Sequence, residues 1–578
     1  MTRLQTIASV GRRALPNQWD LVAFGIVFAG LASIAHVYPG VTAKLPKTGL
    51  EAIDLGYANL PYYALRTTLR MFAALAASFA FTFTYATLAA KSRRAETVLV
   101  PLLDILQSVP ILGFLTFTVT FFLGLFPGSV FGAELAAVFA IFTSQAWNMA
   151  FSFYQSLKTV PRDLEEVSAG FRLSGWQTFW QLEAPFAVPG LIWNTMMSMS
   201  GGWFFVVASE AITVGDTTVS LPGVGSYIAK ANESGDWRAI LAAVATMALV
   251  ILAYDQLLFR PVIAWAGKFR VETSASQTQE ESWALDLLRR TKWMRALWMP
   301  LVRRMRAIAL WRLEFPWTRG GGPASANSGA RVVALDWAWY ALVAALTAGA
   351  LHYAVSYMAA SLTFADVGVA ALLTFYTLLR VVALMALATA VWVPISVMIG
   401  LNPKLSAAIQ PLAQFLAAFP VNLLFGAAVS LVLTFDLNPD VWLSLLIVFG
   451  TQWYIVFNVI AGATAFPNDL REAAANFRVR GWQWWRSVIL PGIFPYYFTG
   501  ALTASGGSWN AAIVAEYVTW KGKTVAAHGI GAYIAEATAK GDFPRIVLGV
   551  ASMSIVVTLF NRLFWRRLYA YAERRLRL

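Results

Sequence analysis

Long apolar segments separated by short polar connections follow one another along nearly the whole chain. A helix that crosses the apolar layer of a bilayer takes about 20 residues, and each segment is close to that length or longer. The predicted spans, six in each half of the chain, are 19–38, 62–90, 97–125, 133–157, 189–213, 238–265, 333–354, 366–400, 405–435, 440–464, 494–518 and 543–566. The pattern predicts an all-α polytopic membrane protein with about 12 transmembrane helices.

Composition agrees with a membrane protein. Hydrophobic residues make up 58% of the 578 residues and charged residues 13%, and the mean hydropathy is +0.60, which is too apolar for a soluble protein of this size. The chain has no cysteine, which excludes disulfides and thiolate metal sites. Its three histidines are far apart in sequence, so no metal site is predicted.

The net charge of +14 is concentrated beside the apolar segments, at residues 91–94, 267–331 and 566–578. The positive-inside rule places such stretches in the cytoplasm, which predicts cytoplasmic N- and C-termini and no nucleic-acid binding. The first apolar segment resembles a signal peptide, but its apolar run is longer than a usual signal core and no clear small-residue cleavage site follows. We therefore expect it to remain as an anchor helix.

The second half of the chain repeats the first. Glu166 and Glu472 are 306 residues apart, and the same separation relates their neighbours without a gap. The pairs at this separation include Pro161/Pro467, Arg172/Arg478, Gly175/Gly481, Trp176/Trp482, Glu210/Glu516, Gly225/Gly531, Tyr227/Tyr533 and Asp236/Asp542, and a separation of 310 relates Thr67/Thr377, Arg70/Arg380 and Pro110/Pro420. Because six spans is an even number, the repeats are parallel, and any pathway is expected between the two halves.

The predicted domains follow from this repeat. They are an N-terminal anchor helix and periplasmic loop (1–60), the first repeat (61–266), a basic amphipathic cytoplasmic linker (267–331), an additional helix of the second half (332–365) and the second repeat (366–578). Within the linker, residues 285–313 mix eight Arg and Lys with Trp, Leu and Met, which is typical of a helix on a membrane surface. We expect Pro300 to break this helix. A disordered linker is the alternative.

Two polar loops interrupt the apolar pattern at equivalent places, residues 161–185 and 467–491. In the first, Pro161 suits the first turn of a helix, and Glu165 and Glu166 suit its positive N-terminal end. Gly175 offers a break before a second helix that contains Trp176. A short helix with a charged tip and an apolar base has the form of a docking element. An ordinary interfacial helix–turn–helix is the alternative.

These loops resemble the EAA loop in the membrane subunits of bacterial ABC importers. The motif is literal in the second copy, as Glu472, Ala473 and Ala474 after Pro467 and before a Leu-Pro at 490–491, and it is degraded in the first copy. Arg172 and Arg478 stand where the family usually has glycine, so we expect the turn to be shifted toward Gly175 and Gly481. The resemblance covers roughly residues 60–265 and 370–578. The downstream segments 223–236 and 529–542 most resemble the nitrate, sulfonate, taurine and bicarbonate branch.

This resemblance implies a type I ABC importer-like fold of two six-helix repeats, in a multi-pass protein of the bacterial inner membrane. It implies a non-enzymatic permease subunit with two ATPase-coupling loops (Pro161, Glu165, Glu166, Arg172, Gly175, Trp176, Pro467, Glu472, Ala473, Ala474, Arg478, Gly481 and Trp482). The implied partners are two copies of an ABC ATPase, forming a homo- or heterodimer, a periplasmic or lipid-anchored substrate-binding protein, and membrane lipid. No cofactor is expected in this chain, while ATP and Mg²⁺ belong to the ATPase. The implied substrate is a small anion such as nitrate, a sulfonate or bicarbonate.

Polar residues inside spans are costly and are candidates for the pathway. The candidates are Gln145, Asn148, Glu210, Asn422, Gln452 and Glu516. For the two glutamates, anchoring a neighbouring segment is the favoured alternative, and for the amides it is a hydrogen bond between helices. Arg70 and Arg380 suit attraction of an anion or an interfacial anchor. Pro110 and Pro420 are expected to kink their helices.

A secondary transporter and a membrane enzyme are the two alternative functional classes. An ion-gradient-driven secondary transporter with parallel repeats needs ionisable residues deep in the spans, and Asp104 and Asp255 are the nearest ones. A membrane enzyme needs a nucleophile and base set that the sequence does not contain. The segment 522–524, Gly-Lys-Thr, lacks the first glycine of a P-loop, because position 517 is Tyr, so no nucleotide site is predicted.

Overall fold

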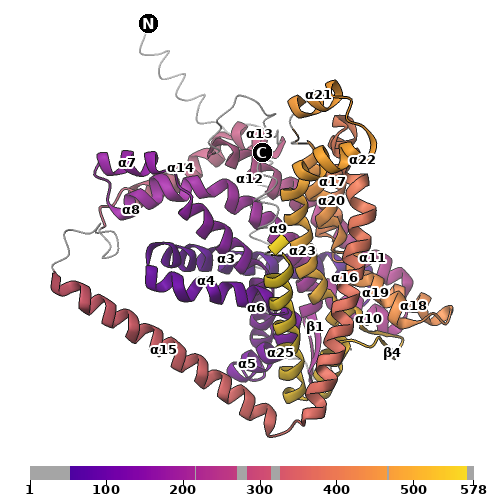
Figure 1. The fold of residues 1–578 in the computed structure, drawn as a ribbon. Coiled ribbons are helices and arrows are strands. Elements are labelled where there is room, and N and C mark those ends of the chain that lie inside the picture. The colour runs from indigo at the N-terminus through magenta and orange to yellow at the C-terminus, as the bar shows by residue number, and fades with distance from the viewer. Residues whose placement is uncertain are drawn as a thin grey trace.

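The computed structural model describes residues 53–214, 217–269, 283–313, 326–464, 466, 468–565 and 567–568. These residues are almost entirely helical, with two short hairpins (Figure 1). The predicted span 19–38 lies outside the described residues.

The first repeat is a series of long helices with two shorter insertions. Its elements are α3 (Leu60–Lys91), α4 (Arg93–Ser108), α5 (Ile111–Leu125), α6 (Val130–Lys158), α7 (Arg162–Gly170), α8 (Gly175–Thr178), the π-helical η3 (Phe179–Glu183), α9 (Ala184–Glu210), β1 (Ala211–Val214), β2 (Thr217–Ser220), α10 (Val224–Ser234), α11 (Trp237–Tyr254), η4 (Asp255–Phe259), α12 (Arg260–Ala266) and η5 (Gly267–Phe269). Three linker and connecting helices follow, α13 (Trp283–Arg290), α14 (Lys292–Ala309) and α15 (Ala326–Ala359).

The second repeat has the same order of elements. It comprises α16 (Phe364–Gly400), α17 (Pro403–Ala418), η7 (Val421–Leu424), α18 (Phe425–Thr434), α19 (Pro439–Phe449), α20 (Gln452–Thr464), α21 (Asn468–Asn476), α22 (Gly481–Trp484), η8 (Trp485–Ile489), α23 (Leu490–Ala515), β3 (Tyr517–Trp520), β4 (Lys523–Ala526), α24 (Ile530–Lys540), α25 (Phe543–Phe560) and η9 (Asn561–Trp565). A short 3-10 turn, η2 (Tyr57–Asn59), precedes α3 in the first repeat.

Among the described residues, seven helical segments are long and apolar enough to cross a membrane, and eight if the bent pair α17 and α18 counts as one span. The seven are Tyr57–Lys91, Val130–Lys158, Trp237–Ala266, Trp337–Ala359, Phe364–Gly400, Pro439–Thr464 and Phe543–Trp565. The helices α9 and α23, at two further predicted spans, are 27 and 26 residues long but are not among these. The fold class, an all-α polytopic membrane protein, is therefore confirmed.

Proline acts differently at three predicted sites. Pro110 and Pro420 lie between two helices rather than inside one, and the second pair, α17 and the segment after Pro420, is bent by 74°. At Pro110 and Pro420 the helix is thus interrupted and not only kinked. In the linker, the prediction was wrong, because α14 continues through Pro300. A proline inside a helix removes one backbone hydrogen bond, and the remaining bonds of this 18-residue helix still hold its two ends together.

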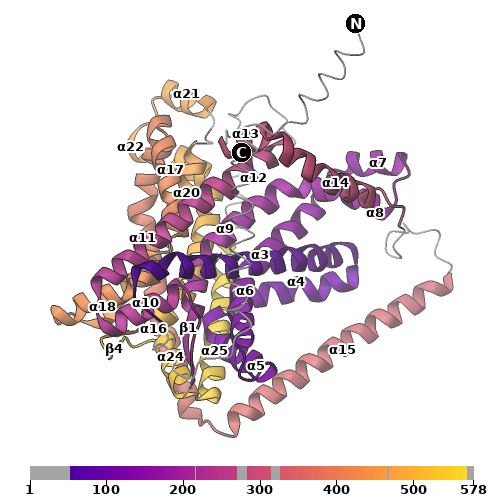
Figure 2. The same ribbon diagram turned by 180° about the vertical axis from the view of Figure 1, so that it is seen from behind.

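The two repeats pack against each other through equivalent elements. In the first repeat α5 contacts α23 and α25 of the second, and α17 and η7 of the second repeat contact α9 and α11 of the first. The polar contacts that cross this interface include those from Ile111 N to Asn510 Oδ1 (2.7 Å) and from Asn422 Nδ2 to Phe204 O (3.1 Å). Figures 1 and 2 show α7, α8, α21 and α22 at one end of the molecule and the hairpins toward the other.

At the hairpin end, the second repeat reaches across to the first. The backbone N–H of Lys521, in the turn between β3 and β4, donates to Asn232 O of α10 (3.1 Å). The rings of Trp237 and Trp520 lie beside this contact, with centroids 5.4 Å apart. Gly235 leaves room for it, since a Cβ there would lie 1.9 Å from the Lys521 side chain. The two halves therefore share one continuous surface at this end.

Candidate functional site

The two polar loops begin with equivalent helices, α7 and α21, which end in the same turn. In α7, Arg172 N donates to Ala169 O (2.9 Å) and Leu173 N donates to Ser168 O (3.2 Å). In α21 the corresponding bonds run from Arg478 N to Ala475 O (3.0 Å) and from Val479 N to Ala474 O (2.9 Å). This pair of bonds defines a Schellman motif, which satisfies the free carbonyls at a helix C-terminus.

A Schellman motif needs a left-handed residue after the helix, and here that residue is arginine. The φ angles of Arg172 and Arg478 are 51° and 55°. The expectation that the turn is shifted toward the following glycines was therefore wrong. The two backbone bonds of the motif require the left-handed conformation at Arg172 and Arg478. This conformation costs conformational energy for a residue that has a Cβ.

We expect glycine at these positions to stabilise the protein. A left-handed conformation costs a residue with a Cβ about 1–2 kcal/mol, and part of the gain is offset by the greater freedom of glycine in the unfolded chain. Arg172→Gly and Arg478→Gly should each raise the free energy of unfolding by about 1 kcal/mol. The measurement is the thermal unfolding midpoint of the purified chain. Arg478→Ala is the matched control, because alanine keeps the strain, and an equal gain from it would contradict the explanation.

After the turn the two loops differ. In the first, Ser174 caps α8 through a capping box with Gln177, and Gly175 begins that helix. In the second, Gly481 itself is left-handed, with φ 60°. Trp176 is half-buried, whereas its counterpart Trp482 is 73% exposed.

The predicted acidic positions of both loops face outward. The side chains of Glu165, Glu166 and Glu472 are exposed, Ala473 is half-buried and Ala474 is buried. Pro161 is the N-cap of α7. Its counterpart Pro467 lies outside the described residues. Each loop thus presents carboxylates on the first turns of a short helix that projects from the end of the molecule.

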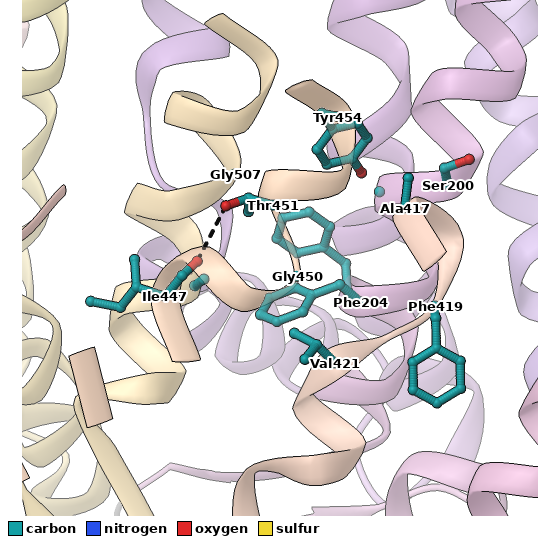
Figure 3. Close-up of a pocket in the computed structure, with 13 residues that line it drawn as sticks. Ser200, Phe204, Ala417, Phe419, Val421, Ile447, Gly450, Thr451, Tyr454 and Gly507 are labelled. Atoms are coloured by element: carbon teal, nitrogen blue, oxygen red, sulfur yellow. Dashed lines mark hydrogen bonds between the residues drawn. The ribbon is translucent and has the colours of Figure 1, made fainter. Parts of the chain in front are cut away.

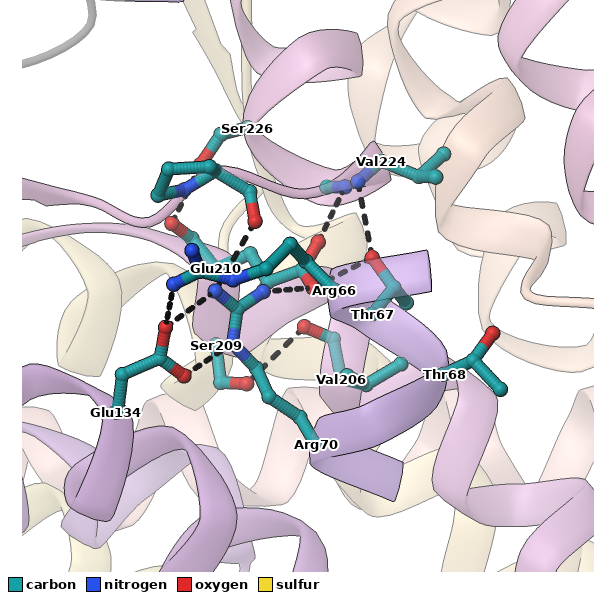
Figure 4. A network of polar contacts seen from close by, with 12 residues as sticks. Arg66, Thr67, Thr68, Arg70, Glu134, Val206, Ser209, Glu210, Val224 and Ser226 are labelled. Carbon is teal, nitrogen blue, oxygen red and sulfur yellow. Dashed lines mark hydrogen bonds and ion pairs between the residues drawn. The ribbon is translucent and has the colours of Figure 1, made fainter. Parts of the chain in front are cut away.

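A buried cluster of charges lies at the opposite end of the first repeat, and Figure 4 shows how its side chains converge. Arg70 pairs with Glu134 (Nε to Oε2, 2.6 Å) and with Glu210 (Nη1 to Oε1, 2.6 Å), and Arg66 also pairs with Glu134. Arg70 Nη2 further donates to Pro222 O (3.0 Å). We call Arg66, Thr67, Arg70, Glu134 and Glu210 the first clamp. Its two arginines and two carboxylates balance in charge.

The first clamp holds the start of α10. The Glu210 carboxylate accepts from Gly225 N (2.6 Å) and from Thr67 Oγ1 (2.7 Å), and Thr67 Oγ1 in turn accepts from Val224 N (3.0 Å). Ser226 Oγ donates to the Glu210 carbonyl (2.6 Å). These donors include free N–H groups of a helix N-terminus, where a carboxylate is favourable.

The second repeat repeats this arrangement. Glu516 accepts from Thr377 Oγ1 (2.9 Å), from Arg380 Nη1 (3.1 Å) and from the N–H groups of Gly531 and Ala532 (2.8 and 3.2 Å). We call Thr377, Arg380, Asp440, Glu516 and His528 the second clamp. Asp440 pairs with Arg380 (2.7 Å) and accepts from the backbone N–H of His528 (2.7 Å). Its histidine, 78% exposed, makes this clamp more open to water than the first.

Sequence reasoning missed Glu134 and Asp440. They are separated by 306 residues, as Glu210 and Glu516 are, and both are acidic near the start of an apolar segment. This spacing can be seen in the sequence, but the residue is Glu in the first copy and Asp in the second. The arginines of both clamps are buried or half-buried and paired with carboxylates. In these contacts, neither clamp offers an unpaired guanidinium to an anion from solution.

Glycines make the clamps possible. A Cβ at Gly223 would lie 2.3 Å from the Glu210 carboxylate, and one at Gly225 would lie 2.2 Å from Val207 O. The equivalent distances in the second repeat are 2.2 Å for Gly529 to Glu516 and 2.4 Å for Gly531 to Ala512 O. Both glycines of each Gly-x-Gly segment are thus required for close approach of α10 or α24 to the preceding span.

The remainder of this motif forms a turn between two helices. Gly235 ends α10 with φ 68°, and Asp236 then caps α11 by accepting from Arg238 N (2.9 Å) and Ala239 N (3.2 Å). Burial raises the pKa of Tyr227 to about 12. This tyrosine therefore stays protonated, and its hydroxyl donates to Leu55 O (3.0 Å). Each motif residue has a structural role.

The four amides predicted for the pathway bond to neighbouring helices. Gln145 is fully buried and accepts from Ser78 Oγ (3.2 Å), and Asn148 accepts from Gln107 Nε2 (2.7 Å). Gln452 accepts from Trp392 Nε1 (2.8 Å). Only Asn422, of these four, bonds across the two repeats, and its Oδ1 is buried with no hydrogen-bond partner among the described residues.

A cavity of about 60 Å³ lies between the repeats, next to Asn422, and Figure 3 shows its lining. Ser200 and Phe204 of α9 form one side, and Thr451 and Tyr454 form the other. None of its lining residues is charged. A second cavity of about 70 Å³ shares Ser200 and is lined by Asp255, Arg260 and Gln414. Neither cavity is lined by Glu210 or Glu516, whose carboxylates are used in the clamps.

The Gly-Lys-Thr segment has a plain structural explanation. Lys521 and Gly522 have φ angles of 48° and 71° and form the two-residue turn between β3 and β4. Two consecutive left-handed residues are typical of a type I′ hairpin turn. A P-loop instead leads from a strand into a helix, so this segment does not bind nucleotide in that manner.

Comparisons with known proteins agree with this arrangement. The sequence model of the binding-protein-dependent transport system inner membrane component family matches residues 82–259 and 392–578. The bicarbonate transport system permease protein CmpB of Synechococcus elongatus is 30% identical over 190 residues, which are 33% of this chain and 65% of that protein. The nitrate import permease protein NrtB of Leptolyngbya laminosa is 28% identical over 172 residues, 30% of this chain and 58% of that protein.

The similarity to NrtB of a Synechocystis species is 26% over 189 residues, or 32% of this chain and 65% of that protein. The chain thus spans less than two thirds of the length of each of these relatives. The family match, in contrast, covers more than half of the chain in two separate stretches, one in each repeat. The protein therefore belongs to the family of binding-protein-dependent transport system inner membrane components, as a fused double permease of the inner membrane.

Proposed function

We propose that this chain is the membrane subunit of an ATP-driven ABC importer and couples to separate ATPase subunits through its two polar loops. The observation that carries the proposal is the matched pair α7 and α21. Both helices project from the same end of the molecule, expose acidic residues and end in the same Schellman turn (Figure 1). A homologous pair of projecting helices suits a dimeric motor, since each helix can enter one groove.

The mechanism requires the loops to move the repeats. Closing two ATPases around ATP draws two docked helices together, and rigid helices transmit this displacement into the membrane. η3 and η8 connect the loops directly to α9 and α23, which lie at the interface of the repeats. Displacing the loops therefore opens or closes the space between α9 and α23.

The substrate passes between the two repeats in this proposal. The two cavities lie along α9 and α17 and share Ser200, which suits a path along that interface. Asp255, in the second cavity, accepts from Gln414 of the other repeat (3.3 Å) and from Arg260 (3.2 Å). These contacts close the interface beside the second cavity, at the end where α12 lies (Figure 1). Among the predicted pathway residues, Asn422 donates to the carbonyl of Phe204, a residue that lines the first cavity.

The proposed substrate is a small anion. Support comes from the printed functions of the relatives, bicarbonate and nitrate transport, and from the hydroxyl groups that line the first cavity. Hydroxyl groups such as those of Ser200, Thr451 and Tyr454 can donate to an oxyanion. ATP and Mg²⁺ are assigned to the partner ATPase, and a periplasmic or lipid-anchored binding protein is assigned as the donor. The family match lends no support to the ion-gradient alternative.

The test is a double substitution in the loops. Glu166→Ala/Glu472→Ala removes one exposed carboxylate from each helix, and truncating a charged partner in an interface costs about 2–5 kcal/mol. We expect loss of a copurifying ATPase subunit and of anion uptake by cells. Glu233→Ala/Glu536→Ala is the matched control. It also removes two exposed carboxylates, each 55% exposed, but at the end of the molecule opposite the loops. Retention of ATPase and uptake by the loop variant shows that the loops do not couple.

A further inference from the structure

Among the described residues, the linker helix α14 forms side-chain hydrogen bonds with the first of the two loops and none with the second. Trp176 Nε1 donates to Ile308 O (2.7 Å), and Gln177 Nε2 donates to Leu310 O (2.8 Å). These carbonyls lie at the C-terminal end of α14, where the last backbone acceptors lack the usual donor four residues on, and Ile308 O also accepts from Trp311 N (3.1 Å). Side chains of the first loop therefore cap the linker helix. In both views α14 lies beside α8 (Figures 1 and 2).

The contact lies at the base of the loop. Trp176 and Gln177 belong to α8, which leads through η3 into α9, a predicted span. The predicted span begins at residue 189, so η3 and the first residues of α9 separate it from the contact. Hence α14 contacts the segment between the span and the projecting tip, which is formed by α7.

The C-terminal half of α14 is exposed on two chemically different faces. Met299, Val302 and Met305, spaced by three residues, have exposed fractions of 41%, 53% and 59%. Arg303 and Arg304 lie on the adjoining face and are also exposed. An apolar face flanked by arginines is typical of a helix that lies in the interface of an anionic membrane, where the apolar side chains enter the acyl region and the arginines reach phosphates.

The second loop has no equivalent contact among the described residues. Gln177 is 8% exposed, whereas its counterpart Gln483 is exposed, and Trp482 is 73% exposed. The linker thus makes two otherwise equivalent loops unequal.

We propose that α14 binds anionic phospholipid of the cytoplasmic leaflet and thereby restrains the base of the first loop, but not that of the second. The inference rests on the proposed function only where residues 161–185 are taken as a coupling loop. Lipid binding by α14 is argued from its exposed faces and its position. Its consequence is that membrane charge acts on one of the two ATPase docking sites.

The test uses the full chain in nanodiscs of phosphatidylcholine, with and without about one third phosphatidylglycerol. The chain has no cysteine, so single spin labels can be placed by Phe171→Cys and Phe477→Cys. These equivalent positions, 306 residues apart, are 75% and 83% exposed. We expect phosphatidylglycerol to reduce the mobility of the label at residue 171 and to leave that at residue 477 unchanged.

Two further measurements make the result specific. Arg303→Gln/Arg304→Gln should abolish the effect at residue 171, whereas Arg480→Gln/Arg486→Gln, the same charge loss in the second loop, should preserve it. A label at Met305→Cys should become accessible to oxygen rather than to an aqueous relaxation agent when phosphatidylglycerol is present. An equal response at residues 171 and 477, or a Met305 label that stays in water, overturns the proposal.

A docked protein partner is a separate outcome. If the label at Met305→Cys is protected only when an ATPase subunit is added, α14 is part of the ATPase interface and the lipid proposal is wrong. Neither spin-label measurement in lipid alone depends on an ATPase. Failure of the lipid proposal is thus distinguishable from failure of the coupling proposal, which the loop glutamates test.

Discussion

Replacing Arg70 by methionine is expected to destabilise the protein by about 3–5 kcal/mol, because it leaves the buried Glu210 without its counter-charge and leaves Glu134 with Arg66 alone. Arg70 is 3% exposed, and its two partners, Glu134 and Glu210, have side-chain exposures of 8% and 0%. Methionine fills much of the same volume, so the loss reflects charge and not a cavity. The measurement is the thermal unfolding midpoint of the detergent-purified chain, together with its yield.

The matched control is Arg380→Met in the second clamp. Arg380 is 15% exposed, its partner Asp440 is 37% exposed, and water can replace part of the lost interaction. We expect a smaller loss of stability there than at Arg70. If the two variants unfold at the same temperature, burial of the first clamp does not determine its contribution. If Arg70→Met is as stable as the parent, the charged cluster is dispensable.

Gly225→Ala is expected to cost about 3 kcal/mol or more, which is at the upper end of the usual range for overpacking. The added Cβ would lie 2.2 Å from Val207 O and 2.9 Å from Val207 Cα. These are backbone atoms of α9, so the clash cannot be relieved by a change of rotamer. α10 must move away from α9, and this movement also breaks the 2.6 Å bond from Gly225 N to Glu210.

Two variants bracket this prediction, and the thermal unfolding midpoint serves for all three. Gly531→Ala, at the equivalent position, should also be destabilising, since its Cβ would lie 2.4 Å from Ala512 O. Gly349→Ala, in α15, has no atom within 4 Å of the new Cβ, and alanine is a better helix former, so its stability should be unchanged or slightly higher. Equal midpoints for Gly225→Ala and Gly349→Ala would show that close packing of α10 is not required.

Much of the architecture follows from the sequence because the repeat supplies an internal comparison. The 306-residue separation pairs Glu210 with Glu516, and the 310-residue separation pairs Arg70 with Arg380. Apolar length and positive flanks predict the helices. What the pattern does not contain is which pairs touch: Arg70 and Glu210 are 140 residues apart and meet only when α3 and α9 pack together. The contacts within the clamps therefore could not be predicted from the sequence.

The errors have local causes. The preference of left-handed turns for glycine predicted a shifted turn. The two backbone bonds of a Schellman motif instead fix which position must be left-handed, whatever residue stands there, so Arg172 takes this conformation. Proline preference predicted a break at Pro300, but the helix continues on both sides. The contact of Trp176 with Ile308 spans 132 residues and a linker without a second copy, so no internal comparison could reveal it.

The contact between the β3–β4 turn and α10 has a consequence for stoichiometry. A permease of two identical subunits offers any protein that lands on this surface two equivalent orientations, related by rotation. Here the two repeats differ in sequence, so this surface offers one correct orientation to any protein that binds it. Each substitution on that surface is also present once per chain, because the equivalent position of the other repeat is a separate residue. The parts of the surface contributed by the two repeats can therefore be altered by mutation independently of each other.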